Sequence, residues 1–135
     1  MNRSPLVLVT DDDRDTRELY RACFDLSGYR TAEAETGAEA IALTERLLPD
    51  VLLTDLVLPD LDGCAVAARV KRDERTAGVC VFLVTGHASE GLTQRAVDVG
   101  IARVLLKPCP PRTMLREIQR VLDRRTVGAA PLGQA

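Results

Sequence analysis

The sequence predicts an α/β fold: a doubly wound parallel β-sheet of five strands with helices on both faces. The first observation is a set of continuous apolar runs, rich in Val and Leu, at residues 6–9, 51–53, 79–84 and 104–106. Such runs are typical of strands buried on both faces of a parallel sheet. A fifth segment, 29–34, alternates between polar and apolar residues, which favours a position nearer the sheet edge.

The second observation is that the segments between these runs have the apolar spacing of helices that cover a sheet. Thr36 and Glu39 have capping-box spacing, Gly28 and Gly100 follow helical patterns, and the proline pair at 110–111 suits a first helical turn. Strand and helix therefore alternate five times, which requires right-handed crossovers. The apolar positions expected to face the sheet are Leu19, Cys23 and Leu26; Leu43 and Leu47; Val66 and Val70; Leu92, Ala96 and Val99; and Leu115, Ile118 and Leu122.

Length and composition fit one domain. The chain has 135 residues, of which 46% are apolar, enough to fill a single core. We place this domain at residues 1–125. Residues 126–135 are small, contain glycine and proline, and are expected to form a flexible C-terminal tail or the start of a linker.

The charge balance gives no electrostatic reason to expect direct nucleic-acid binding or a membrane partner. The net charge is −2, from 18 basic and 20 acidic residues. The four cysteines lack a C-x-x-C pair or the spacing of a zinc site, so we expect reduced, buried thiols. Because neither a secretory signal nor a run of membrane-spanning length is found, the cytoplasm is the expected compartment.

Polar residues follow the apolar runs at the points where the strands should end. The acids 11–13 follow the first run, Asp55 follows the run at 51–53, Thr85 follows 79–84, and Lys107 follows 104–106. In an open parallel sheet, functional groups gather at the carboxyl ends of the strands, next to the point where strand order reverses. We therefore expect these side chains to converge on one edge.

Several carboxylates in contact repel one another unless positive charge lies among them. A divalent cation and the Lys107 ammonium would supply that charge, and hard oxygen ligands favour Mg²⁺. Such a site suits phosphoryl transfer with Asp55 as nucleophile. Neither G-x-x-x-x-G-K-[ST] nor G-x-G-x-x-G occurs, so the phosphoryl group is expected from a donor other than a cradled nucleotide.

Four motifs, in order, resemble the receiver domain of two-component response regulators, and the likeness runs from about Leu6 to Leu122. They are the acid pair in "VTDDD", the acceptor stretch "DLVLPDLDG", the Thr of "LVTGH" and the Lys-Pro of "LLKPC". The resemblance implies a flavodoxin-like sheet with strand order 2-1-3-4-5 and five flanking helices. It also implies a phosphoacceptor signalling domain, with self-catalysed phosphorylation and dephosphorylation at most, instead of an enzyme.

The resemblance further implies a role for single residues. Asp55 would be the phosphoacceptor, Asp12 and Asp55 would bind Mg²⁺ directly, Asp11 would help through water, and the Val57 backbone carbonyl would be a further ligand. Mn²⁺ could substitute for Mg²⁺.

Two further residues would act on the phosphoryl group itself. The Thr85 hydroxyl would hydrogen-bond it, and Lys107, followed by a cis peptide to Pro108, would make a charge-assisted contact. The donor would be the phosphohistidine of a sensor histidine kinase or of a histidine phosphotransfer protein.

Two positions depart from the family pattern, and both concern output. Val104 stands where the last strand usually carries Tyr or Phe, so the usual aromatic rotamer switch is missing; Cys109 stands where Phe often follows Lys-Pro. Two other positions would tune the phosphoryl lifetime. Val57 has no side-chain group to orient an attacking water, whereas His87, two residues after Thr85, is placed to orient water or to shield the phosphoryl group.

The other charged residues have structural explanations. Asp13 is expected to cap a helix, and Asp60 and Asp62 are expected to shape a Pro- and Gly-containing turn. His87 is the single histidine and is expected on a surface loop instead of on a metal. The arginines at 14, 17 and 21 are expected on a charged helix face, with no ligand.

Two alternatives stay open. A phosphatase with an aspartyl-phosphate intermediate usually has a second Asp two residues after the nucleophile, where this chain has Val57. An interaction module that kept the pocket but works without phosphorylation is compatible with Val104. The sequence also leaves open the cognate kinase, the downstream effector, a homodimer, and whether the chain stands alone or is part of a larger protein.

Overall fold

The computed structural model describes residues 4–129, with side chains described up to residue 125. Five strands form one parallel sheet in the order β2-β1-β3-β4-β5, as predicted. The strands are β1 (Leu6–Thr10), β2 (Arg30–Ala34), β3 (Val51–Asp55), β4 (Cys80–Thr85) and β5 (Arg103–Leu106). The helices are α1 (Arg14–Leu26), α2 (Gly37–Leu47), α3 (Gly63–Arg72), α4 (Glu90–Asp98) and α5 (Pro111–Ala129).

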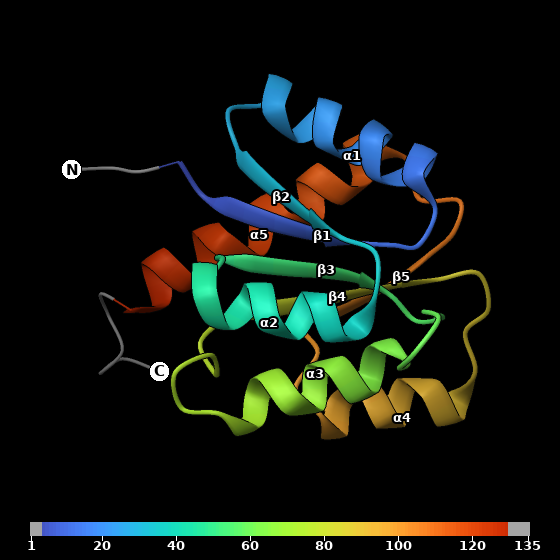
Figure 1. Cartoon of the computed structure of the whole chain (residues 1–135). Coiled ribbons are helices and arrows are strands. Elements are labelled where there is room, and N and C mark those ends of the chain that lie inside the picture. The colour runs from blue at the N-terminus through green and yellow to red at the C-terminus, as the bar shows by residue number, and fades with distance from the viewer. Residues whose placement is uncertain (1–3, 130–135) are drawn as a thin grey trace.

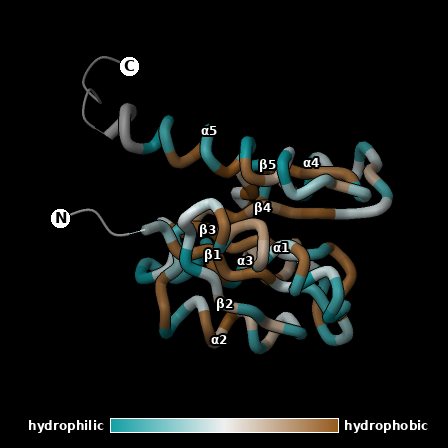
Figure 2. The backbone as a smooth tube through the Cα atoms, turned by 90° about the horizontal axis from the view of Figure 1, so that it is seen from above, coloured by the Kyte–Doolittle hydropathy of each residue, from teal (hydrophilic) through white to brown (hydrophobic). Residues whose placement is uncertain are grey.

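The helices form two layers, with α1 and α5 on one face of the sheet and α2, α3 and α4 on the other (Figure 1). The α1/α5 face buries Phe24 and Ile118 against Val7, Val9 and other strand residues. The opposite face is filled by smaller aliphatic side chains from β1, β3, α2 and α3. Figure 2 shows the central strands mainly hydrophobic and α5 alternating between hydrophobic and hydrophilic turns. The doubly wound α/β class is confirmed.

The central and edge strands differ in burial. Along β1, β3 and β4 nearly every side chain is buried, whereas β2 is mostly half-buried, in agreement with its alternating sequence. The expectation that the run at 104–106 is buried on both faces was wrong. No residue of β5 is fully buried, and Leu106 is exposed. The physical reason is that β5 pairs only with β4 and forms the second edge of the sheet.

The face that α1 turns toward the sheet also differs from the prediction. We expected Leu19, Cys23 and Leu26, but Leu26 is 89% exposed and Leu19 is exposed as well. The buried residues of α1 are Arg17, Tyr20 and Phe24. The predicted and the observed residues form two rows with similar helical spacing. Burying the aromatic rings of Tyr20 and Phe24 removes more apolar surface from water than burying Leu19 and Leu26 would.

The predicted helix boundaries agree with the structure. Thr36 caps α2 by accepting from the Glu39 amide, and Gly28 and Gly100 follow α1 and α4 with φ values of 88° and 83°. The last helix begins at Pro111 and runs to Ala129, so residues 126–129 continue a helix where we expected a tail. Residues 130–135, the rest of that expected tail, lie outside the described residues.

Candidate functional site

Five side chains gather at the carboxyl edge of the sheet. Asp11 and Asp12 follow β1, Asp55 ends β3, Thr85 ends β4, and Lys107 follows β5. This is also the edge where strand order reverses, because β1 lies between β2 and β3. Ligand sites of open α/β sheets are found at such a switch point. The structure therefore brings together the residues that the sequence placed at separate strand ends.

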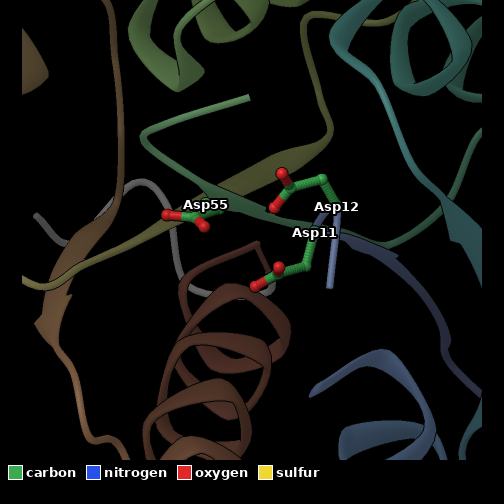
Figure 3. Close-up of side chains that lie close together, drawn as sticks. All are labelled: Asp11, Asp12 and Asp55. Carbon is green, nitrogen blue, oxygen red and sulfur yellow. The ribbon is translucent and has the colours of Figure 1, made fainter. Parts of the chain in front are cut away.

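Three of these side chains form a carboxylate cluster. One oxygen from each of Asp11, Asp12 and Asp55 lies within 4.8 Å of the others. The three side chains lie close together at the ends of β1 and β3 (Figure 3). The side chains of Asp11 and Asp55 are 6% and 12% exposed, whereas Asp12 is exposed. The cluster is thus closed at its base and open to solvent on the Asp12 side.

Lys107 follows β5, the outermost strand on one side of the sheet, and its side chain reaches the carboxylate cluster. Its Nζ donates to Asp11 Oδ2 at 3.2 Å and to Asp55 Oδ2 at 3.0 Å. The peptide bond between Lys107 and Pro108 is cis, as predicted. The ammonium therefore bridges two of the three carboxylates.

Burial and neighbouring charges shift the pKa values of both Asp11 and Lys107. Burial raises the pKa of the Asp11 carboxyl above its usual value, although a hydrogen bond from the Asp13 amide and the charge of Lys107 oppose the shift. For Lys107, burial alone would lower the pKa. The hydrogen bond to Asp55 and the charges of Asp11 and Asp55 outweigh it, so the pKa is raised. The lysine therefore stays protonated at neutral pH.

The donor set of the cluster fits a hard divalent cation. Three carboxylates face a single ammonium, so two negative charges are left without a positive partner at this edge. Carboxylate oxygens that leave room for water are the ligands that Mg²⁺ prefers, and soft donors such as thiols are not among the clustered groups. The residues present therefore fit Mg²⁺ better than a zinc or copper ion.

Thr85 is buried at the end of β4, the strand next to β3, and its hydroxyl is hydrogen-bonded to the following loop. Thr85 Oγ1 donates to the His87 carbonyl and accepts from the His87 amide, both at 3.2 Å. The His87 side chain is exposed, as expected for a surface loop. Val104 is half-buried and packs against a small cluster that contains Leu83 and Leu92.

The loop after Asp55 folds back on itself. The Val57 amide lies 3.4 Å from Asp55 Oδ1, Val57 pairs with Asp62 in an isolated antiparallel bridge, and the Gly63 amide donates to the Leu56 carbonyl at 2.7 Å. A Cβ on Gly63 would lie 2.6 Å from the Asp55 carbonyl oxygen, so only glycine allows this approach. The Val57 side chain is exposed, and its backbone amide lies next to the Asp55 carboxylate.

Three other acids of these loops have structural roles; the cap by Asp13 was predicted, whereas Asp60 and Asp62 were expected only to shape a turn. Asp13 caps α1 and Asp62 caps α3, each accepting from a backbone amide of the first turn. Asp60 accepts from the amides of Gly37 and Ala38, so it joins the acceptor loop to the start of α2.

Arg17 is a residue whose environment the sequence reasoning missed. We placed it with Arg14 and Arg21 on a charged helix face, but Arg17 is buried and hydrogen-bonds the carbonyl of Asp11. Its spacing from Tyr20 and Phe24 is helical, which could have indicated that it shares their buried face.

Comparison with known proteins identifies the family and the fold. The family model described as "Response regulator receiver domain" matches residues 7–119, which includes every residue of the cluster and Lys107. The chain belongs to the response regulator receiver domain family. Receiver domains are signalling modules of two-component systems, in which aspartate phosphorylation and Mg²⁺ binding at an acidic cluster are family features.

Individual relatives agree with this assignment. The chain is 31% identical, over 90% of its length, to the phosphate regulon transcriptional regulatory protein PhoB of Pseudomonas aeruginosa, and spans about half of that protein (53%). It resembles the structure of a CheY-like receiver domain protein from Methanospirillum hungatei, with a TM-score of 0.87 and 26% identity over 92% of this chain and 98% of that one.

A second structural neighbour bears on the site. The receiver domain of a sensor histidine kinase from Pseudomonas aeruginosa has a TM-score of 0.79 and 25% identity, over 87% of this chain and 97% of that chain. Its structure contains a magnesium ion coordinated in the active-site cleft. Receiver domains as a family interact with histidine kinases or phosphotransfer proteins. Within residues 4–129 of the present chain, none of the helices combines the length and the apolar character needed to cross a membrane.

Proposed function

We propose that this receiver domain takes a phosphoryl group from a phosphohistidine onto Asp55 in the presence of Mg²⁺, and that it signals through an altered surface. The observation that carries the proposal is the convergence of Asp11, Asp12 and Asp55 on one point that the Lys107 ammonium also reaches. Phosphoryl transfer needs a positioned nucleophile and concentrated positive charge. Asp55 is the proposed nucleophile, and the carboxylates are ligands for a cation that would add to the charge of Lys107.

Each residue of the cluster has a proposed role. Asp12, Asp55 and the Val57 carbonyl would hold Mg²⁺ directly, and Asp11 would hold it through water; Mn²⁺ could replace it. When bound, the ion supplies positive charge to the phosphoryl oxygens.

The protein groups carry the rest of the reaction. A carboxylate oxygen of Asp55 attacks phosphorus, so that an O–P bond forms while the P–N bond of the phosphohistidine breaks. Lys107, already 3.0 Å from Asp55, is placed to contact a phosphoryl oxygen. Thr85 would exchange its hydrogen bond with the His87 backbone for one to the phosphoryl group.

The partners follow from this chemistry. The donor is proposed to be a sensor histidine kinase or a histidine phosphotransfer protein, and the reaction is proposed to take place in the cytoplasm. Direct contact with nucleic acid or membrane is not part of the proposal, and the downstream effector and a homodimer stay open.

The assignment of Asp55 is tested by phosphorylation with a small donor. The full chain is incubated with Mg²⁺ and acetyl phosphate, and its intact mass is measured. We expect one added phosphoryl group in the wild type, none in Asp55→Asn, and none when the metal is chelated. Asp60→Asn is the matched control, because Asp60 lies in the same loop but outside the cluster, and should be phosphorylated like the wild type. Phosphorylation of Asp55→Asn would refute the assignment.

A second candidate is an interaction module that works without phosphorylation. It is favoured by Val104, a small side chain where the family's aromatic switch would be, packed against Leu83 and Leu92. The two functions differ in one measurement: amide chemical shifts of α4 and β5, recorded with and without a beryllium fluoride mimic of the phosphoryl group. We expect shifts in α4; unchanged spectra with the mimic bound would favour the second candidate.

An aspartyl-phosphate phosphatase is the weakest alternative. The position two residues after Asp55 is Val57, which has no acid to protonate a leaving group. We therefore expect no turnover of phosphate monoesters such as p-nitrophenyl phosphate.

A further inference from the structure

Arg17 is a buried cation whose three hydrogen-bond partners lie in two segments of the chain, at the ends of β1 and β2. Only 5% of the residue is exposed. Its Nε donates to Glu33 at 2.7 Å, its Nη2 to Glu35 at 3.1 Å, and its Nη1 to the backbone carbonyl of Asp11 at 2.8 Å. Glu33 lies in β2 and Glu35 follows it, so the guanidinium of α1 spans the ends of β1 and β2.

The carbonyl that Arg17 holds belongs to the peptide group between Asp11 and Asp12. Because a peptide group is planar, fixing its oxygen fixes the backbone plane between two of the three clustered carboxylates. The same residue is held on its other side, where the Asp11 amide donates to the Ala34 carbonyl at 3.2 Å. Asp11 Oδ1 also accepts from the Asp13 amide at 2.9 Å. This backbone therefore cannot turn without breaking a charge-assisted hydrogen bond.

The chemistry of the network explains why arginine occupies this place. A guanidinium offers a rigid, planar set of donors and stays charged when buried. Glu33 and Glu35 balance its charge, and Arg21 binds the second oxygen of Glu33. A lysine would keep the charge but would lose the fork that serves three acceptors at once. The network thus places an oriented donor at the acid pair without leaving an unbalanced charge.

We propose that Arg17 is a positioning residue for divalent-cation binding, which orients the Asp11–Asp12 peptide so that both carboxylates face Asp55. The inference rests on the proposed function, because it takes the carboxylate cluster as the Mg²⁺ site. Arg17 acts through the ligands and touches neither the cation nor the phosphoryl group. Partners that orient metal ligands typically change metal affinity by about 10- to 100-fold when they are replaced.

The experiment compares Arg17→Met with Arg21→Met in the full chain, without any phosphodonor. Arg21 is a matched control: it lies on the same helix and contacts the same Glu33, but its other hydrogen bond goes to Thr31 instead of to Asp11. Free Mn²⁺ is measured by electron paramagnetic resonance, Mg²⁺ affinity is obtained by competition, and thermal unfolding is followed in parallel. We expect both variants to lose Tm, and only Arg17→Met to raise the Kd for Mg²⁺, by about tenfold.

Two more variants separate orientation from charge and from folding. Arg17→Lys keeps the charge and is expected to weaken Mg²⁺ binding as well. Glu35→Gln removes a partner whose side chain is 66% exposed, so it should fold and should raise the Kd by less than Arg17→Met does. If Arg17→Met does not fold, these two variants decide. A wild-type Kd in Arg17→Lys, or equal weakening in Arg21→Met, would overturn the inference.

The outcomes also distinguish this inference from the proposed function. A wild type that binds Mg²⁺ but never acquires a phosphoryl group refutes the function while leaving the role of Arg17 supported by its Kd. A phosphorylated wild type with no effect of Arg17 on the Kd refutes the inference alone. A wild type that binds neither Mn²⁺ nor Mg²⁺ refutes both.

Discussion

The two halves of the carboxyl edge are built differently. On the β1–β2 half, the acid pair rests on an ion network around the buried Arg17, and α1 also buries Tyr20 and Phe24. On the β4–β5 half, the Thr85 hydroxyl is held by one backbone neighbour, residues 86–91 are all exposed, and α4 buries only Leu92 and Ala96. Segments with few buried contacts open most easily, so the first half suits fixed chemistry and the second suits a surface that changes.

The largest expected effect is on stability, and it tests the difference in packing. Phe24→Ala should lower the free energy of unfolding by about 3–5 kcal/mol, because it leaves a cavity in the largest core cluster. Leu92→Ala should cost about 2 kcal/mol, at the low end for a buried leucine, because its cluster is small. Urea unfolding followed by circular dichroism measures both, and equal losses would contradict the asymmetry.

The next prediction concerns Lys107, which links the two halves. Lys107→Ala should slow phosphoryl incorporation into Asp55 by about 10²- to 10³-fold, the typical cost of removing one charged or hydrogen-bonding contact to the transferring group. Lys71→Ala is the control: its ammonium donates to the carbonyls of Ala77 and Val79 near the start of β4, at the opposite edge of the sheet. Time courses of intact mass should show the wild-type rate for the control.

A smaller effect is expected at Thr85. Thr85→Ala removes one neutral hydroxyl, worth about 1 kcal/mol, so the phosphorylation rate should fall by about fivefold. The response of α4 amide shifts to phosphorylation should disappear, whereas Thr85→Ser should retain it. A loss of phosphorylation as large as that of Lys107→Ala would show that both halves contribute equally to the chemistry.

The pH dependence of stability probes the ion network. The hydrogen bond from Arg17 and the nearby Arg21 charge hold the pKa of Glu33 below its usual value of 4.5. Glu33 therefore contributes stability that is present above about pH 4.5 and is lost as pH falls through its lower folded pKa. Glu33→Gln should flatten the stability curve of the wild type in that window. Glu18→Gln, on the exposed side of the same helix, is the control variant for the loss of one carboxylate.

The smallest effect is expected at the ion pair that joins the acceptor loop to α4. Arg95 donates to Asp62 at 2.8 Å, but the two side chains are 55% and 41% exposed. Arg95→Ala should cost no more than about 1 kcal/mol. Asp62→Ala should cost about 1 kcal/mol more, because Asp62 also caps α3. A larger loss in Arg95→Ala, measured by urea unfolding, would mean that the α4 side is held more firmly than the structure indicates.

The fold and most of the site could be predicted from local signals. Strand runs, helix caps at Thr36 and Gly100, and the order of the four motifs each depend on a few neighbouring residues, and the strand ends then place Asp55 and Lys107 on one edge. Which residues are buried was harder to predict from the sequence. On α1 two rows of residues have helical spacing, and on β5 an apolar run resembles a central strand. Which of these residues become buried depends on the elements that pack against them in the folded chain.

The sequence by itself determined the α/β class, the acids and lysine at the carboxyl edge, and the capping role of Asp13, because these follow from periodicity and from short-range hydrogen bonding. Only the tertiary structure decided that Arg17 is buried and holds the Asp11 carbonyl. That arrangement needs Glu33 of β2 and Glu35 just after it to approach α1, and a charged side chain enters a protein interior only where such partners balance its charge.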